Sequence, residues 1–157
     1  MMRYPVNEPL APFFMINEFL AFNDKFWPSY NHIINLTNLA IKLGEFRKVL
    51  GRMDITSGWR SRAWNTSVGG DLNSYHLQGL AADFERKNDK GVEDWGTWTP
   101  ETLAAVANYI GFGNIGVYLR KGTKSILWVH VDIGKPWSEG NGWKRYSNTM
   151  SFKIYEK

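Results

Sequence analysis

Two of the three histidines in this chain of 157 residues stand in patterns that could bind a metal. His76 lies in the segment S-Y-H-L-Q-G-L-A-A-D, in which Gly79 permits a tight turn before a run of small apolar residues that ends at Asp83. Imidazole nitrogen and carboxylate oxygen are both good zinc donors. Because a carboxylate within an apolar run is costly unless it is paired or metal-bound, Asp83 is either a ligand or a hydrogen-bonded turn residue.

The second candidate is His130, in the segment I-L-W-V-H-V-D-I. Side chains alternate along a strand, so Trp128, His130 and Asp132 share one face while apolar residues occupy the other. This pattern favours a strand with one face in the core and the other in a functional cleft, over an ordinary edge strand. Two histidines and one carboxylate leave a fourth position for water, which is typical of catalytic zinc. His32 has no acidic partner in sequence and is interpreted as a structural or surface residue.

Several motifs together resemble the M15 zinc peptidases. They are I-T-S-G-W-R-S, then Asn65 and Gly69-Gly70, then S-x-H-x-x-G-x-A-x-D, and finally W-V-H-V-D. That family includes D-alanyl-D-alanine carboxypeptidases and phage endolysins that cut the L-alanyl-D-glutamate bond, and the hedgehog signalling domain shares its fold. The similarity runs from about residue 35 to residue 143, and the ten-residue motif is matched at Ser74, His76, Gly79, Ala81 and Asp83.

The resemblance implies one zinc ion bound by His76, Asp83 and His130. It also implies that Arg60 binds a carboxylate or carbonyl oxygen of the substrate, a task that suits its planar and permanently charged fork. Arg62 is the alternative residue for that task.

Two further residues are expected to contact the substrate. Ser74 belongs to the matched motif. Trp128, like Trp59, Tyr118 and Trp143, is expected either to form a wall of the cleft or to pack in the core.

The segment before His130 departs from the family pattern. Many relatives carry a Glu or Asp a few residues earlier as general base, whereas residues 123–129 contain no acid. Asp132 is the nearest carboxylate and shares the face of His130. It is therefore assigned either as general base or as the residue that orients His130. If neither holds, the base is a distant acid or the domain is not catalytic.

Helices and strands that could position these residues follow from the apolar spacing. Helices are predicted at 16–22, 36–50 and from Thr99-Pro100 to residue 110, and strands at 53–57, 79–84, 115–119 and 125–133, with polar loops at 58–73 and 85–96. The predicted class is α+β: a small, mainly antiparallel sheet with helices on one side and a zinc site in a cleft on the sheet. We expect one domain over residues 1–157, with residues 1–32 as an N-terminal arm that packs on it.

Composition limits the partners and the compartment. There is no cysteine, which excludes disulfides and thiolate sites. The net charge of +4 favours polyanions such as bacterial walls, but no basic run of five residues supports nucleic-acid binding. Pro5, Glu8 and Pro12 interrupt the segment where a signal peptide would need an apolar stretch, and no segment is long enough for membrane insertion. We expect a monomer that is made in the cytoplasm and reaches the cell wall by other means, as a phage-encoded factor would.

The function predicted on these grounds is zinc-dependent hydrolysis of a peptide bond in the peptidoglycan stem peptide. The enzyme would be a D,D-carboxypeptidase or an L-alanyl-D-glutamate endopeptidase. The alternative is a non-catalytic, zinc-stabilised module that binds the cell wall or a protein. A nucleic-acid binder is a third reading, supported only by charge and aromatic content.

Overall fold

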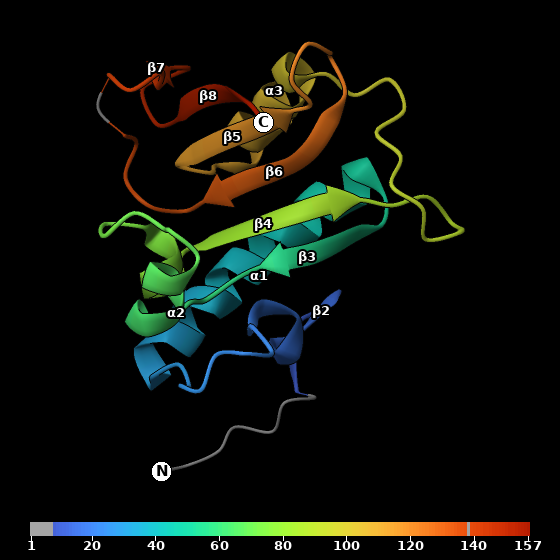
Figure 1. Cartoon of the computed structure of the whole chain (residues 1–157). Helices are drawn as coiled ribbons and strands as arrows, with labels where there is room; N and C mark the ends of the chain where they lie inside the picture. Colours follow the sequence, from blue (N-terminus) through green and yellow to red (C-terminus); the bar gives the residue numbers. More distant parts are fainter. Residues whose placement is uncertain (1–7, 138) are drawn as a thin grey trace.

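The fold is built on a six-stranded sheet, which the computed structural model describes together with the rest of residues 8–137 and 139–157. In spatial order the strands are β3 (Met53–Ser57), β4 (Ala81–Arg86), β6 (Ile126–Asp132), β5 (Asn114–Leu119), β8 (Ser151–Glu156) and β7 (Lys144–Arg145) (Figure 1). Neighbouring strands are antiparallel except β5 and β8, which are parallel. The predicted α+β class with a mainly antiparallel sheet is confirmed.

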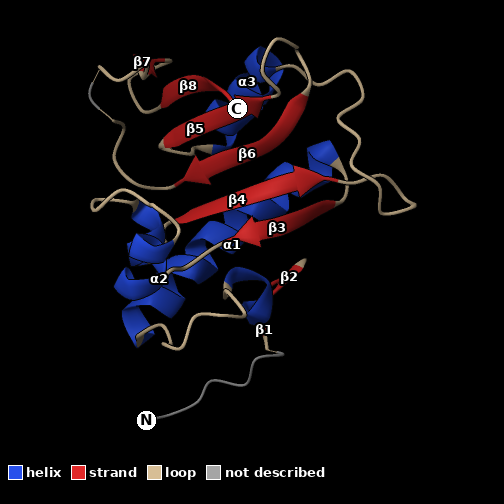
Figure 2. Cartoon of the chain, viewed as in Figure 1, coloured by secondary structure: helices blue, strands red, loops and turns tan. Residues whose placement is uncertain are grey.

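Two helices, α1 (Tyr30–Leu50) and α3 (Pro100–Ile110), pack against one face of this sheet (Figure 2). The side chain of Ser29 caps α1 by accepting from the backbone N–H of His32, and Pro100 begins α3 in the first turn, where its missing N–H costs nothing. Alternate residues of the central strands, such as Phe84 and Val129, join the apolar stripes of the helices in one buried core. The opposite face of the sheet is therefore available for polar chemistry.

The N-terminal segment packs on the same core. It contains β1 (Pro9–Ala11), β2 (Phe14–Met15) and the four-residue 3-10 helix η1 (Ile16–Phe19), which is shorter than the helix predicted at 16–22. Phe14 and Phe19 are buried against α1 residues. Of the arm predicted over residues 1–32, residues 1–7 lie outside the described part. Among the described residues, no helix is both long and apolar enough to cross a membrane.

Several short elements were not predicted, including the following two. The region 58–73, expected to be a loop, contains the short helix α2 (Arg62–Ser67), which is capped by the Ser61 hydroxyl. The tail, expected to be irregular, contributes β8 to the sheet. The short helix was missed because helix propensity is a weak signal over six polar residues. The strand was missed because β8 pairs with β5, whose residues lie more than thirty positions away in the sequence.

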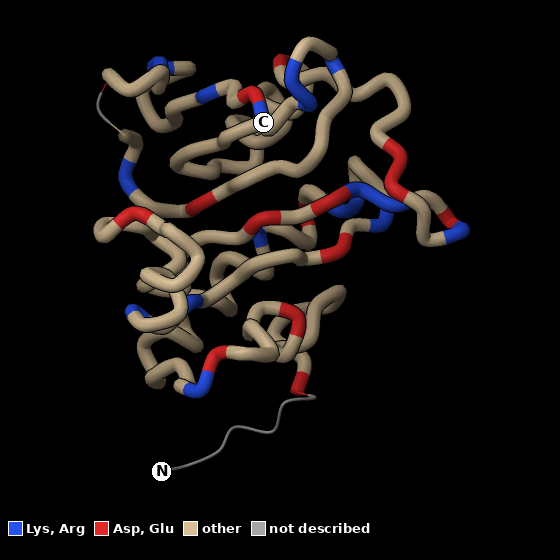
Figure 3. The backbone as a smooth tube through the Cα atoms, in the orientation of Figure 1, with Lys and Arg blue, Asp and Glu red and all other residues tan. Residues whose placement is uncertain are grey.

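Charges of both signs lie side by side where β3 begins and β4 ends (Figure 3). Arg52 pairs with Asp54 at 3.4 Å, and Lys87 pairs with Glu85 at 2.6 Å. These partly exposed pairs contribute little to stability individually. These four charges therefore cancel locally.

Candidate metal centre and active site

The register of the sheet places two of the predicted ligands next to each other. Asp83 on β4 pairs with His130 on β6, and Ser57 on β3 pairs with Asp83. On the other side His130 pairs with Gly116 on β5, which in turn pairs with Lys153 on β8. Directly opposite residues share one face with their Cβ atoms about 5 Å apart. One row across five strands therefore carries the polar groups on the face that α1 and α3 leave uncovered.

The third predicted ligand, His76, comes from the 3-10 helix η2 (Tyr75–Gln78). The Ser74 hydroxyl caps this helix by accepting from the His76 backbone N–H, and Gly79 ends it in the left-handed conformation with φ 72°. A Cβ atom on Gly79 would also lie 2.8 Å from the carbonyl oxygen of His32. Both the left-handed turn and the close approach require glycine, and together they direct His76 toward the start of β4.

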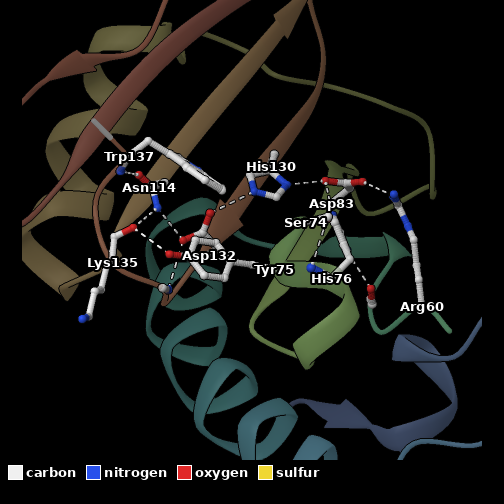
Figure 4. Close-up of polar contacts among 12 residues, drawn as sticks. Arg60, Ser74, Tyr75, His76, Asp83, Asn114, His130, Asp132, Lys135 and Trp137 are labelled. Carbon is white, nitrogen blue, oxygen red and sulfur yellow. Dashed lines mark hydrogen bonds and ion pairs between the residues drawn. The ribbon is translucent and has the colours of Figure 1, made fainter. Parts of the chain in front are cut away.

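Hydrogen bonds turn one nitrogen of each histidine toward Asp83 (Figure 4). The Nδ1–H of His76 donates to the Gly58 carbonyl at 2.6 Å, which leaves Nε2 3.4 Å from Asp83 Oδ1. The Nε2–H of His130 donates to Asp132 Oδ2 at 3.1 Å, and its Nδ1 lies 2.9 Å from the same Asp83 oxygen. One candidate ligand atom from each of His76, Asp83 and His130 lies within 4.8 Å of the others.

This donor set fits a divalent metal such as zinc. Ligands 2.0–2.1 Å from a tetrahedral ion lie roughly 3.4 Å from one another, close to the separations of Asp83 Oδ1 from the two imidazoles. The remaining imidazole N–H groups are held by a backbone carbonyl and a carboxylate, as is usual for metal-binding histidines. The structure thus brings together the three residues predicted as ligands.

The electrostatics of the metal-free centre depend on the same contacts. Burial favours the neutral form of Asp83, but the adjacent His76 and the hydrogen bond from His130 act more strongly, so the pKa of Asp83 lies well below its ordinary value. Burial likewise lowers the pKa of His130, but its hydrogen bonds to Asp132 and Asp83 outweigh burial and raise that pKa to about 9. Without metal, His130 is therefore protonated at neutral pH.

This raised pKa predicts that the metal-free protein loses stability in alkali. The folded pKa of His130, about 9, exceeds its ordinary value of 6.5. Its contribution is then fully present below pH 6.5 and is lost as the pH rises through 9. The melting temperature in chelator should fall over this window, as measured by calorimetry. His130→Gln should remove most of the fall, and an equal fall in both proteins would contradict the assignment.

Asp132 lies behind His130 and does not face the cavity. Its side chain is fully buried, and Oδ1 accepts hydrogen bonds from the Asn114 side chain at 2.7 Å and from the Gly134 backbone N–H at 3.1 Å. Oδ2 is directed at His130. Of the two roles left open by the sequence, this geometry favours orientation of His130 over removal of a proton from a water molecule in the cavity.

Asp132→Asn distinguishes the two roles. The two donors at Oδ1 would hold the amide oxygen there, so the amide NH₂ would face His130 Nε2 and place the imidazole proton on Nδ1. That tautomer cannot bind a metal through Nδ1. We expect zinc affinity to fall by about 10- to 100-fold in a chelator competition. Unchanged affinity combined with a lower kcat would instead indicate a general base.

Arg60 lies on the other side of Asp83. Its guanidinium donates to Asp83 Oδ2 at 3.1 Å, to the Ser57 hydroxyl at 2.9 Å and to the Asn65 side-chain oxygen at 3.5 Å. The guanidinium is thereby fixed beside the candidate metal centre, where the sequence predicted a substrate-binding arginine. Arg62, the alternative, is exposed at the start of α2.

A cavity of about 490 Å³ opens over this centre, a size typical of small-molecule sites. The three candidate ligands, Arg60 and Ser74 all line it. Trp128 is not among the lining residues; its ring stacks on Tyr118, which does line the cavity, with centroids 4.4 Å apart. The substrate-binding roles of Ser74 and Trp128 stay predictions, and for Trp128 the contact would be through Tyr118.

The comparisons with known proteins address the family directly. A model of the family described as peptidase M15 matches residues 13–132, about three quarters of the chain. The chain belongs to the peptidase M15 family. It is therefore a member of a metal-dependent peptidase family, as the sequence motifs predicted. Comparison with curated proteins gives no match.

The matched region of this M15 peptidase contains every predicted ligand, but it does not contain the whole cavity. The lining residues that follow residue 132 are Trp137, Glu139, Gly140, Asn141, Trp143, Lys153 and Tyr155. Sequence analysis proposed Trp143 only as a general cleft aromatic and missed Lys153 and Tyr155. The alternation F-K-I-Y along residues 152–155 was the signal that could have found them.

Proposed function

We propose that this M15 peptidase hydrolyses a peptide bond in the peptidoglycan stem peptide and that its metal is a single zinc ion. The observation that carries the proposal is the convergence of one donor atom each from His76, Asp83 and His130 at the wall of an open cavity. The imidazole protons point away from this convergence. A metal site with a purely structural role would not need to open into a cavity, whereas a catalytic site must admit the substrate.

The residues of the chain have separate tasks in this proposal. A bound zinc ion supplies a Lewis acid and lowers the pKa of water. His76, Asp83 and His130 hold it, and Asp132 keeps His130 in the required tautomer. The charged fork of Arg60 binds the carbonyl oxygen of the scissile bond and stabilises the negative charge that develops there.

The general base has to come from a carboxylate that can reach the substrate. Besides Asp83, the lining residues of the cavity include two acids, Asp71 and Glu139, both exposed. We therefore propose one of these two as the base, in place of the buried Asp132. Metal-loaded Asp71→Asn and Glu139→Gln proteins should differ, with a large loss of kcat in only one of them.

Action at the bacterial wall is part of the same proposal. The net charge of +4 supports approach to an anionic wall, and a phage-encoded, wall-degrading factor delivered by other means fits that role. The bond that is cut is either the terminal D-alanyl-D-alanine bond or the L-alanyl-D-glutamate bond.

Mass spectrometry of muropeptide digests tests the function and identifies the bond together. Purified wall peptides are incubated with protein as prepared, after chelation, and after zinc is restored. We expect cleavage that disappears with chelator and returns with zinc. Free D-alanine as product would indicate a carboxypeptidase, and an internal cut would indicate an endopeptidase.

The second candidate function is a zinc-stabilised binding module without turnover. It is favoured by the burial of Asp132, the carboxylate nearest to His130 in sequence. Binding of intact wall fragments with no cleavage under any metal condition would support this module and contradict the proposed hydrolase.

A further inference from the structure

A second cation lies across the cavity from Arg60. Lys153 on β8 occupies the same cross-strand row as Asp83 and His130, separated from His130 by Gly116 alone. Two strand spacings place the Cα atoms of His130 and Lys153 roughly 10 Å apart. Both side chains line the cavity. About three residues of extended peptide, at roughly 3.5 Å each, would cover that separation.

The position of Lys153 is fixed by its neighbours. Its Nζ lies 4.2 Å from the centroid of the Tyr155 ring, a cation–π contact, and a Cβ atom on Gly142 would lie 3.0 Å from its Cε. Gly116 leaves room for the Tyr155 ring, since a Cβ atom there would lie 3.1 Å from Tyr155 Cε2. The Tyr155 ring thus occupies the space at Gly116, and the Lys153 ammonium lies over that ring.

Arg60 and Lys153 differ in whether an acidic side chain pairs with them. Arg60 is already bonded to Asp83, whereas Lys153 has no carboxylate within 4.0 Å among the residues that the structure describes. A half-buried ammonium without an acidic partner favours an anion supplied from outside the chain. In a peptide substrate the group of that chemistry is a free carboxylate.

We infer that Lys153 binds a free carboxylate of the substrate peptide, within about three residues of the scissile bond, and so selects peptides with a carboxylate there over their amides. This inference rests on the proposed peptidase function and makes it more specific. Two free carboxylates of a stem peptide lie beside the candidate bonds: the C-terminal carboxylate of D-alanyl-D-alanine and the α-carboxylate of D-glutamate. Either one pairs with the ammonium, and no covalent step is involved.

The test compares wild type and Lys153→Met on two pairs of peptides, with cleavage by each protein measured in the presence of zinc. In one pair the C-terminal carboxylate is free or amidated, and in the other the D-glutamate α-carboxylate is free or amidated. For the relevant pair, amidation should raise the KM of wild type about tenfold or more, and that of Lys153→Met less than twofold. Lys153→Arg should restore the preference. The pair that responds identifies the carboxylate.

Lys157→Met is the matched control. Lys157 also stands over an aromatic ring, with Nζ 5.9 Å from the Tyr118 centroid, but it does not line the cavity. The Lys157→Met variant should prefer free carboxylates over amides to the same extent as wild type. Zinc content and melting temperature should be equal in all variants, which separates charge from folding. Equal discrimination by wild type and Lys153→Met in both pairs would overturn the inference.

Direct binding keeps this test separate from the test of hydrolysis. Titration calorimetry of the same peptides gives the carboxylate preference as a ratio of Kd values without turnover. If wild type cleaves none of the peptides but binds the carboxylate form more tightly, and Lys153→Met binds both forms equally, the proposed hydrolase fails and the role of Lys153 stands. If it cleaves both forms equally well and binds them equally, the hydrolase stands and the role of Lys153 fails.

Discussion

His130→Ala should abolish zinc binding and lower peptide hydrolysis by at least about a thousandfold. The mutation removes one of three candidate ligands, and it also leaves two carboxylates without the imidazole that bridges them, Asp83 at 2.9 Å and Asp132 at 3.1 Å. A bound metal stabilises the transition state by several kcal/mol, and the loss of that stabilisation corresponds to this factor at about 1.4 kcal/mol per tenfold change in rate.

Metal content by mass spectrometry and activity on wall peptides measure this effect. Because buried Asp132 would lose its partner, His130→Gln provides a second variant of more similar size. His32→Ala is the histidine control: its ring accepts from the Ser29 backbone N–H at the start of α1, far in sequence from the ligands. It should lose some stability and keep its zinc. Near-stoichiometric zinc in His130→Ala would refute the ligand assignment.

Arg60→Ala should lower kcat by about 100- to 1000-fold with zinc retained. This is the usual loss when one donor to a developing oxyanion is removed. Arg60 also donates to Asp83 Oδ2, so some weakening of metal affinity is expected, but the three ligand atoms remain. The assay therefore uses saturating zinc and reports kcat and KM separately.

Arg62→Ala is the control for this prediction. Arg62 is two residues away, exposed on α2, and was the alternative substrate-binding arginine. We expect its kcat within about twofold of wild type, since exposed substitutions rarely have larger effects. Arg60→Lys should recover only part of the loss because an ammonium cannot reproduce the planar fork. A large loss in Arg62→Ala with normal Arg60→Ala activity would reverse the assignment.

The ligands could be predicted from sequence because each stands in a local pattern. The spacing from His76 through Gly79 to Asp83 encodes a helix end, a left-handed turn and a strand start, and the alternation around His130 defines which face it occupies. The cross-strand register that makes Asp83 and His130 neighbours is not local. It came instead from the resemblance to a known family.

Two properties could not be predicted from the sequence: how deeply a side chain is buried, and which strands pair over a long sequence separation. Alternation placed Asp132 on the face of His130, but it could not tell that the carboxylate is fully buried behind the imidazole. Similarly, β8 pairs in parallel with β5 across a long connection, and nothing in either segment alone specifies that partner. Lys153 and Tyr155 were missed for this reason.

The parallel pairing of β8 with β5 has a consequence for the evolution of such enzymes. All three candidate metal ligands lie within 13–132, whereas part of the cavity lining is built by later residues. The segment that selects a substrate could therefore be exchanged or diversified while the reactive half stays constant. Grafting the tail of another family member onto this chain should transfer preference without rebuilding catalysis.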